Sequence, residues 1–269
     1  MLKDITFGQY YESRSVIHSI DPRVKIVLMI LAIVFIFISQ NIFSLIFSTI
    51  GVMAVIILSR IPFKMYIKNM KAILPVLIFT AIINLFYGEG GKVILSFWNF
   101  EINTNGIYRS VFMALRIILL ILISSVLTYT TTPNDLTDAI ESLLSPLKFI
   151  GLKSAVHTLA MMMTIALRFI PTLIEEAEKI TNAQKARGAD LENGGLVERV
   201  KALIPILIPL LISSVRRAYE LAEAMECRCY NGGEGKTRMK VMKLKNSDFC
   251  AMTTVLIFCA LIILLNILF

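Results

Sequence analysis

Long apolar runs separated by short polar links are the dominant pattern of this chain. Five runs stand out: Val24–Ser39, Ile42–Ser59, Ala72–Tyr87, Ile107–Tyr129 and Phe249–Phe269. A helix needs about 20 apolar residues to cross the hydrocarbon core of a bilayer, and each run reaches or approaches that length once its flanks are included. The pattern therefore predicts five transmembrane helices.

The segment between the fourth and fifth runs, about Thr131 to Asn246, has a different pattern. It opens with T-T-P-N-D-L-T-D-A-I-E-S-L-L-S-P-L, which is typical of a short, capped amphipathic helix. Two long amphipathic helices are expected next, from about Lys153 to Arg187 and from about Leu196 to Arg228. Prolines predict a kink in the first of them and two interruptions in the second: Pro171, Pro205 and Pro209.

Basic residues alternate between the links, and this alternation predicts the orientation. The N-terminal segment and the link after the second run are basic, whereas Gln40-Asn41, between the first two runs, carries no charge. Cytoplasmic loops of membrane proteins carry an excess of Lys and Arg. We therefore expect a cytoplasmic N-terminus and an external C-terminus.

The predicted fold is thus an all-α integral membrane protein. A membrane region at 1–130 holds four transmembrane helices, a cytoplasmic domain at 131–246 holds one short and two long amphipathic helices, and 247–269 is the last transmembrane helix. Alternatively, Ala155–Ile174 and Ala202–Ser214 would form a transmembrane hairpin. That arrangement places Lys179, Lys185, Arg187 and Arg199 outside, against the positive-inside pattern, so we favour the cytoplasmic placement.

Composition agrees with a membrane protein. The chain has 269 residues, of which 57% are hydrophobic and 17% charged, so it is more apolar than a typical soluble domain. Its net charge of +8 is explained by basic cytoplasmic loops, and no basic stretch interleaved with aromatic residues predicts nucleic-acid binding. The membrane runs contain no arrangement typical of an enzyme, and neither the four cysteines nor the two histidines predict a metal site.

The stretch Y-N-G-G-E-G-K-T, Tyr230 to Thr237, resembles a phosphate-binding P-loop. A Walker A loop requires G-x-x-x-x-G-K-S/T, and Tyr230 stands where the first glycine belongs. Such a loop also follows a strand, whereas this one follows a charged helix. We therefore predict a cytoplasmic turn and no ATP site in this chain.

The two long helices end alike, in A-E-K-I-T-N-A-Q-K-A-R-G and A-Y-E-L-A-E-A-M-E-C-R-C. Aligning Arg187 with Arg228 places small or aliphatic residues of both helices on one face, at Ala177/Ala218, Ile180/Leu221 and Ala183/Ala224. A cation in the last turn is an ordinary helix ending. Two matched endings instead suggest a paired partner, with each arginine offering its planar fork to a carboxylate.

Four stretches resemble the transmembrane coupling (T) component of energy-coupling factor (ECF) transporters, and the resemblance covers nearly the whole chain. They are D-P-R-V-K at Asp21–Lys25, T-D-A-I-E-S-L-L-S-P-L at Thr137–Leu147, I-A-L-R-F-I-P-T-L-I-E-E-A at Ile165–Ala177 and A-Q-K-A-R-G-A-D at Ala183–Asp190. The family carries two short Ala-Arg-Gly-type motifs. Ala186-Arg187-Gly188 matches the first, whereas Cys227-Arg228-Cys229 keeps only the arginine of the second.

The resemblance implies a non-catalytic coupling subunit in the plasma membrane of a prokaryote. Two cytoplasmic ATP-binding-cassette subunits would bind ATP and contact the two arginine motifs, and this chain would need no cofactor. A substrate-binding membrane subunit, the S component, would take up a vitamin or a transition metal, and several S components would be interchangeable. An alternative function is a self-sufficient secondary transporter, for which Arg116 is the one candidate residue in the membrane runs.

Apolar stretches in the two long helices, around Met161–Phe169 and Leu203–Leu211, are the expected S-component interface. The run Met161-Met162-Met163 is explained equally well by helix packing and by an adaptable surface for several partners. The predicted interface residues are Met161, Met162, Met163, Phe169, Leu203, Leu207 and Leu211.

Overall fold

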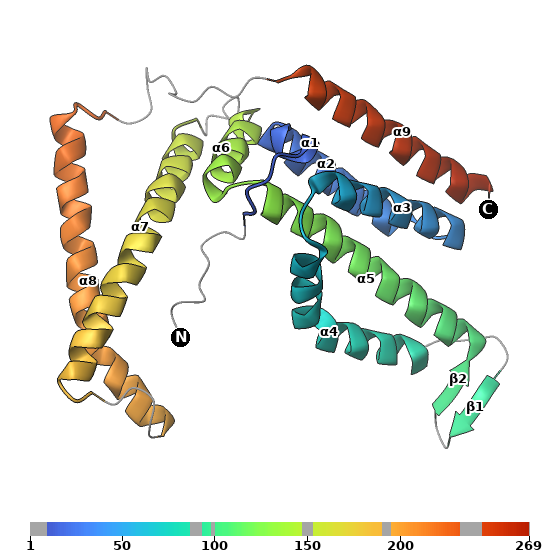
Figure 1. Ribbon diagram of the computed structural model, residues 1–269, viewed down its shortest axis with the longest axis horizontal. Coiled ribbons are helices and arrows are strands. Elements are labelled where there is room, and N and C mark those ends of the chain that lie inside the picture. Colours follow the sequence, from blue (N-terminus) through green and yellow to red (C-terminus); the bar gives the residue numbers. More distant parts are fainter. Residues whose placement is uncertain are drawn as a thin grey trace. The chain divides into compact units, whose positions relative to one another are not determined.

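A computed structural model describes residues 10–86, 93–97, 100–146, 153–189, 195–231 and 244–268 (Figure 1). Contacts divide the chain into two compact units. The bundle unit comprises Gly8–Leu136 and Val241–Phe269, and the long-helix unit comprises Met1–Phe7 and Thr137–Lys240. Most of the P-loop-like stretch, from residue 232 onward, lies outside the described residues.

In its described residues the bundle unit is helical apart from one short antiparallel hairpin, which the apolar pattern of the sequence did not predict. Its elements are α1 (Val16–Ser19), α2 (Pro22–Ile38), α3 (Ile42–Ser59), α4 (Phe63–Phe86), β1 (Val93–Phe97), β2 (Phe100–Asn103), α5 (Thr104–Thr130) and α9 (Asn246–Leu268). The long-helix unit contains α7 (Lys153–Ala186) and α8 (Leu196–Cys227), and α6 (Pro133–Leu143) begins in one unit and ends in the other.

Six helices in the described residues are long and apolar enough to cross a membrane, which confirms the integral membrane class. Four of them, α3, α4, α5 and α9, coincide with predicted spans, whereas α2 has 17 residues and is shorter than any of the six. The other two are α7 and α8, which the charge pattern assigns to the cytoplasm. Their cytoplasmic placement stays a prediction.

The start of α2 follows from its first two residues, as the sequence predicts. Asp21 is the N-cap and its carboxylate accepts the backbone N–H of Arg23 at 3.0 Å, while Pro22 occupies the first helical turn. The cap satisfies one of the N–H groups that a helix leaves unpaired at its start, and proline there costs no hydrogen bond.

Arg116 lies in α5 and forms a hydrogen bond at the end of α2. Its Nη2 donates to the carbonyl oxygen of Ser39 at 2.5 Å, and its guanidinium lies 4.9 Å from the centre of the Phe112 ring. Ser39 is fully buried, so this bond satisfies a helix-end carbonyl that water does not reach. Arg116 therefore faces protein, as expected for an arginine inside a membrane span.

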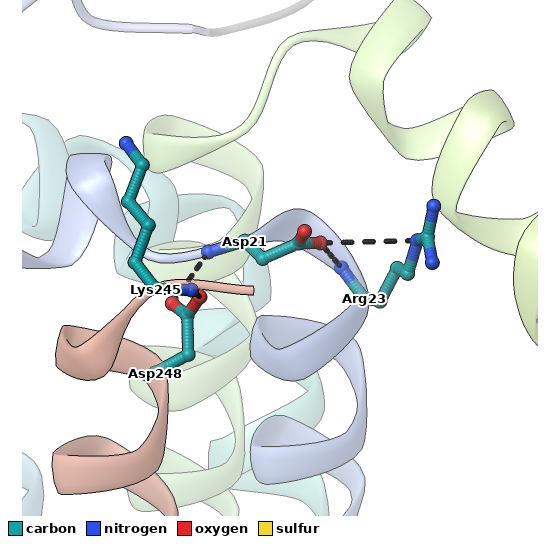
Figure 2. A network of polar contacts seen from close by, with 4 residues as sticks. All are labelled: Asp21, Arg23, Lys245 and Asp248. Atoms are coloured by element: carbon teal, nitrogen blue, oxygen red, sulfur yellow. Dashed lines mark hydrogen bonds and ion pairs between the residues drawn. The ribbon is translucent and has the colours of Figure 1, made fainter. Parts of the chain in front are cut away.

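Helices α2 and α9 are parallel neighbours joined at both ends. The carboxylate of Asp248 in α9 accepts the backbone N–H of Asp21 at 2.9 Å and that of Lys245 at 2.6 Å (Figure 2). At the other end, Nδ2 of Asn266 donates to the carbonyl oxygen of Ile38 at 2.8 Å. Because the two starts meet and the two ends meet, α2 and α9 cross the bundle in the same direction.

Gly51 lets α9 approach α3 closely. The rings of Phe47 and Phe258 stack with centroids 4.5 Å apart, and a Cβ on Gly51 would lie 2.3 Å from the tip of the Phe258 ring. We expect Gly51→Leu to destabilise the bundle by about 1–3 kcal/mol, because overpacking forces the stacked rings apart. Gly51→Ala should cost less, since the ring tip can move.

The measurement is thermal unfolding of the purified protein in detergent. Gly195→Leu is the matched control, since a Cβ there would meet no atom within 4 Å in the part of the chain that the structure describes. Equal midpoints for the two leucine variants would contradict the close approach at Gly51.

Candidate functional site: the two long helices

Helices α7 and α8 cross each other in antiparallel directions (Figure 1). Near the start of α7, the hydroxyl of Tyr230 donates to the sulfur of Met161 at 2.8 Å. Near its end, Nε2 of Gln184 donates to the carbonyl oxygen of Pro205 at 3.3 Å. Early residues of α7 therefore meet residues at the end of α8, and late residues meet its first half.

An ion pair joins the two helices between these contacts. Nη2 of Arg217 lies 2.5 Å from Oε2 of Glu176, and the hydroxyl of Ser213 donates to Oε1 of the same carboxylate. The Glu176 side chain is 20% exposed and that of Arg217 31% exposed, so the pair is largely but not fully shielded from water. Charge-assisted bonds of this kind are stronger than neutral ones.

The predicted interruptions of α8 at its prolines are wrong, because the helix continues from Leu196 to Cys227 with both prolines inside it. Pro209 has no N–H, so the carbonyl of Pro205, four residues earlier, loses its usual helical partner. Gln184 of α7 donates to that carbonyl. A contact between the helices thus replaces a hydrogen bond that the proline removes within one helix. Helix α7 contains Pro171 within one continuous helix, and the predicted kink there stays a prediction.

The two arginine tips, Ala186-Arg187-Gly188 and Cys227-Arg228-Cys229, share one backbone geometry. At the end of α7, the N–H of Gly188 bonds to the carbonyl of Lys185 at 3.0 Å and that of Ala189 to Gln184 at 3.0 Å. At the end of α8, the N–H of Cys229 bonds to Glu226 at 2.8 Å and that of Tyr230 to Met225 at 3.0 Å. The same left-handed helix ending therefore follows both arginines.

Cys229 adopts the conformation that glycine adopts at the first tip. Its φ is 55°, and that of Gly188 is 88°. Left-handed backbone costs a residue with a Cβ about 1–2 kcal/mol. The cysteine therefore strains the second tip without changing the direction in which the chain leaves it.

All six tip residues are exposed: Ala186, Arg187, Gly188, Cys227, Arg228 and Cys229. Within the described part of the chain, neither tip guanidinium makes a hydrogen bond or ion pair. Both arginines are thus available to a partner.

Most of the predicted S-component residues are exposed as well. Met162, Met163, Leu203, Leu207 and Leu211 are 44–65% exposed, whereas Met161 and Phe169 are half-buried. Met161 contacts Tyr230, so packing explains one methionine of the run and leaves the other two on the surface. The role of these residues as an interface stays a prediction.

The two tips were predicted from the sequence, but the ion pair that joins α7 to α8 was not. Glu176 and Arg217 are 41 residues apart, the same offset that aligns Arg187 with Arg228. That offset was a partial signal, because opposite charges at equivalent positions of two antiparallel helices meet only where the helices cross. Glu175 and Arg216 have the same offset and are exposed.

Comparison with known proteins adds independent information. Residues 13–239 match the model of a family described as "Cobalt transport protein". The chain is 49% identical to the "Energy-coupling factor transporter transmembrane protein EcfT" of Clostridium kluyveri, over 98% of this chain and 97% of the relative. It is 47% identical to the protein of that name from Ruminiclostridium cellulolyticum and 39% identical to that from Bacillus subtilis, over at least 99% of each chain.

Proposed function

The chain belongs to the family of energy-coupling factor transporter transmembrane proteins, and from this membership we propose that it is the subunit that couples ATP hydrolysis to uptake. In this role it has no catalytic activity of its own. It joins two ATP-binding-cassette subunits, which bind ATP, to a substrate-binding S component. The transported substrate is a vitamin or a transition metal, and the S component selects it.

The observation that carries this proposal is the equivalence of the two tips. Both end in an exposed arginine, and both close with the same pattern of backbone hydrogen bonds. Two equivalent tips suit two copies of one kind of socket, such as the grooves of two related ATPase subunits. An arginine presents a planar fork that matches a carboxylate in each groove.

The proposed orientation places the N-terminus in the cytoplasm and the C-terminus outside. The parallel course of α2 and α9 supports this orientation, because both helices then begin at the cytoplasmic face and end at the external face. The self-sufficient transporter has less support, since its candidate residue Arg116 is engaged at the end of α2.

Co-purification tests the proposed function. The tagged chain, expressed in its native host and extracted in mild detergent, is expected to bring two ATPase subunits and at least one S component with it. Mass spectrometry identifies the partners and their ratios. Recovery of the chain alone, with substrate uptake intact in a host that lacks the ATPases, would favour the secondary transporter.

Polar substitutions on the apolar surface test the assignment of partners. We expect Leu207→Glu with Leu211→Glu to release the S component while both ATPases stay bound, because a charge on each side chain opposes burial of these exposed leucines. Subunit ratios after the same purification are the measurement. Loss of the ATPases instead would show that this surface faces the other partner.

A further inference from the structure

The ion pair between α7 and α8 lies at equivalent positions of two similar helices. Glu176 precedes Arg187 by 11 residues, and Arg217 precedes Arg228 by 11 residues. Each therefore lies about 16 Å along its helix from its own tip, at 1.5 Å per residue. Since the helices are antiparallel, the two tips extend in opposite directions from the ion pair.

This arrangement gives the helix pair an approximate two-fold axis through the Glu176–Arg217 contact. The other contacts agree with it, because Met161 meets Tyr230 on one side of the ion pair and Gln184 meets Pro205 on the other. The matching helix endings extend the symmetry to the backbone of the tips. A symmetric pair of tips fits a pair of related partner subunits only when the two tips keep a defined separation.

Among the polar contacts between α7 and α8 in the described residues, the ion pair is the strongest that could hold this separation. Both oxygens of the Glu176 carboxylate are engaged, one by Arg217 and one by Ser213. The contacts on either side are a hydroxyl on a thioether and a long amide–carbonyl bond of 3.3 Å. The neutral contacts are weaker than a charge-assisted one, so the helices are held most firmly at the centre.

We infer that Glu176 and Arg217 are positioning residues whose ion pair is the pivot between α7 and α8. It holds the two arginine tips at equal distances on opposite sides of the ion pair. When the ATPases displace the tips, one helix turns against the other about this contact. The inference rests on the proposed function for the role of the tips. The pivot itself is a property of the helix pair.

The experiment measures the separation of the tips directly. Spin labels are attached at Asn182→Cys and Glu223→Cys, exposed and equivalent positions one turn before the tips. The background removes the native cysteines by Cys227→Ala, Cys229→Gly, Cys250→Ser and Cys259→Ala, which gives the second tip the residues of the first. Pulsed electron paramagnetic resonance reports the distribution of distances between the two labels in lipid nanodiscs, for the purified chain and for the complex. The cysteine-free variant is first shown to support substrate uptake.

Glu176→Gln and Arg217→Met are each expected to broaden the distance distribution and to lower ATP-driven uptake about tenfold. This loss is smaller than breaking a fully buried ion pair would cause, because both side chains are partly exposed. ATPase activity and bound subunits should persist. The exchanged pair Glu176→Arg with Arg217→Glu should narrow the distribution again and recover most of the uptake. Glu175→Gln and Arg216→Met, the exposed neighbours related by the same offset, are the matched controls and should change neither quantity.

An unchanged distribution in both single variants would overturn the pivot. So would an exchanged pair that stays as broad as the single variants. If a single variant fails to accumulate, accumulation and a narrow distribution in the exchanged pair support the pivot, and failure of that pair refutes it. Absence of ATPases from the purified chain would refute the proposed function, while the distances in the chain alone would still test the pivot.

Discussion

Replacing both Arg187 and Arg228 by alanine is expected to reduce ATP-driven substrate uptake to near background. If each guanidinium meets a buried carboxylate of an ATPase subunit, its removal leaves that charge unpaired, at a cost of about 3–5 kcal/mol at each interface. If the arginines only stabilise helix ends, the cost is about 0.3–1 kcal/mol and transport survives. Their exposure and their lack of partners within the described chain favour the larger effect.

The single variants should each impair uptake, and the lysine variants should recover it only in part. Lysine keeps the charge but lacks the planar fork that pairs with both oxygens of a carboxylate. The assay is uptake of labelled substrate by reconstituted complexes, with ATPase activity and subunit composition measured in parallel. Arg216→Ala, an exposed arginine of α8 away from the tips, is the control. Near-normal uptake by the double variant would refute the coupling role of the tips.

Asp248→Ala is expected to separate the start of α9 from the start of α2 and to destabilise the bundle strongly. Asp248 is 1% exposed, and its carboxylate accepts two backbone N–H groups, those of Asp21 and Lys245. Leaving a buried donor unpaired costs about 1–3 kcal/mol, so the two together amount to about 2–6 kcal/mol. Asp248→Asn should be intermediate, because an amide offers one oxygen where the carboxylate offers two.

Asp21→Ala is the matched control for this prediction. It removes a carboxylate that caps α2 but leaves in place the backbone N–H that Asp248 accepts. Its expected cost is about 1 kcal/mol, the usual value for a helix cap. Thermal unfolding in detergent compares the variants, and disulfide trapping between cysteines placed in α2 and α9 reports their contact. Equal destabilisation by Asp21→Ala and Asp248→Ala would contradict the role of the Asp248 carboxylate.

Local features were predictable because their causes lie within a few residues. In a bilayer, a single apolar segment satisfies its backbone polar groups within itself by forming a helix, and run length therefore located α3, α4, α5 and α9. The cap at Asp21 depends on two neighbouring residues, and it was found where expected. The likeness of the tips was also visible, because each helix ending is set by its own last turn.

Length and composition do not distinguish α7 and α8 from the predicted membrane helices, because a long amphipathic helix also contains enough apolar residues to resemble a span. The interruptions predicted at the prolines of α8 were wrong for a related reason. Their local effect is to break a helix, but Gln184 of the neighbouring helix partners the carbonyl that Pro209 leaves free. Tertiary packing thus overrode the local preference.

The sequence by itself determined the membrane class, the capped start of α2 and the two arginine endings, because each depends on residues close together in the chain. Only the tertiary structure decided which distant groups meet. Arg116 reaches the end of α2 across 77 positions, Asp248 reaches Asp21 across 227, and Glu176 reaches Arg217 across 41. Such contacts form because packed helices place two polar groups in a shielded region where each needs a partner, and this juxtaposition is a property of the packing rather than of any single segment.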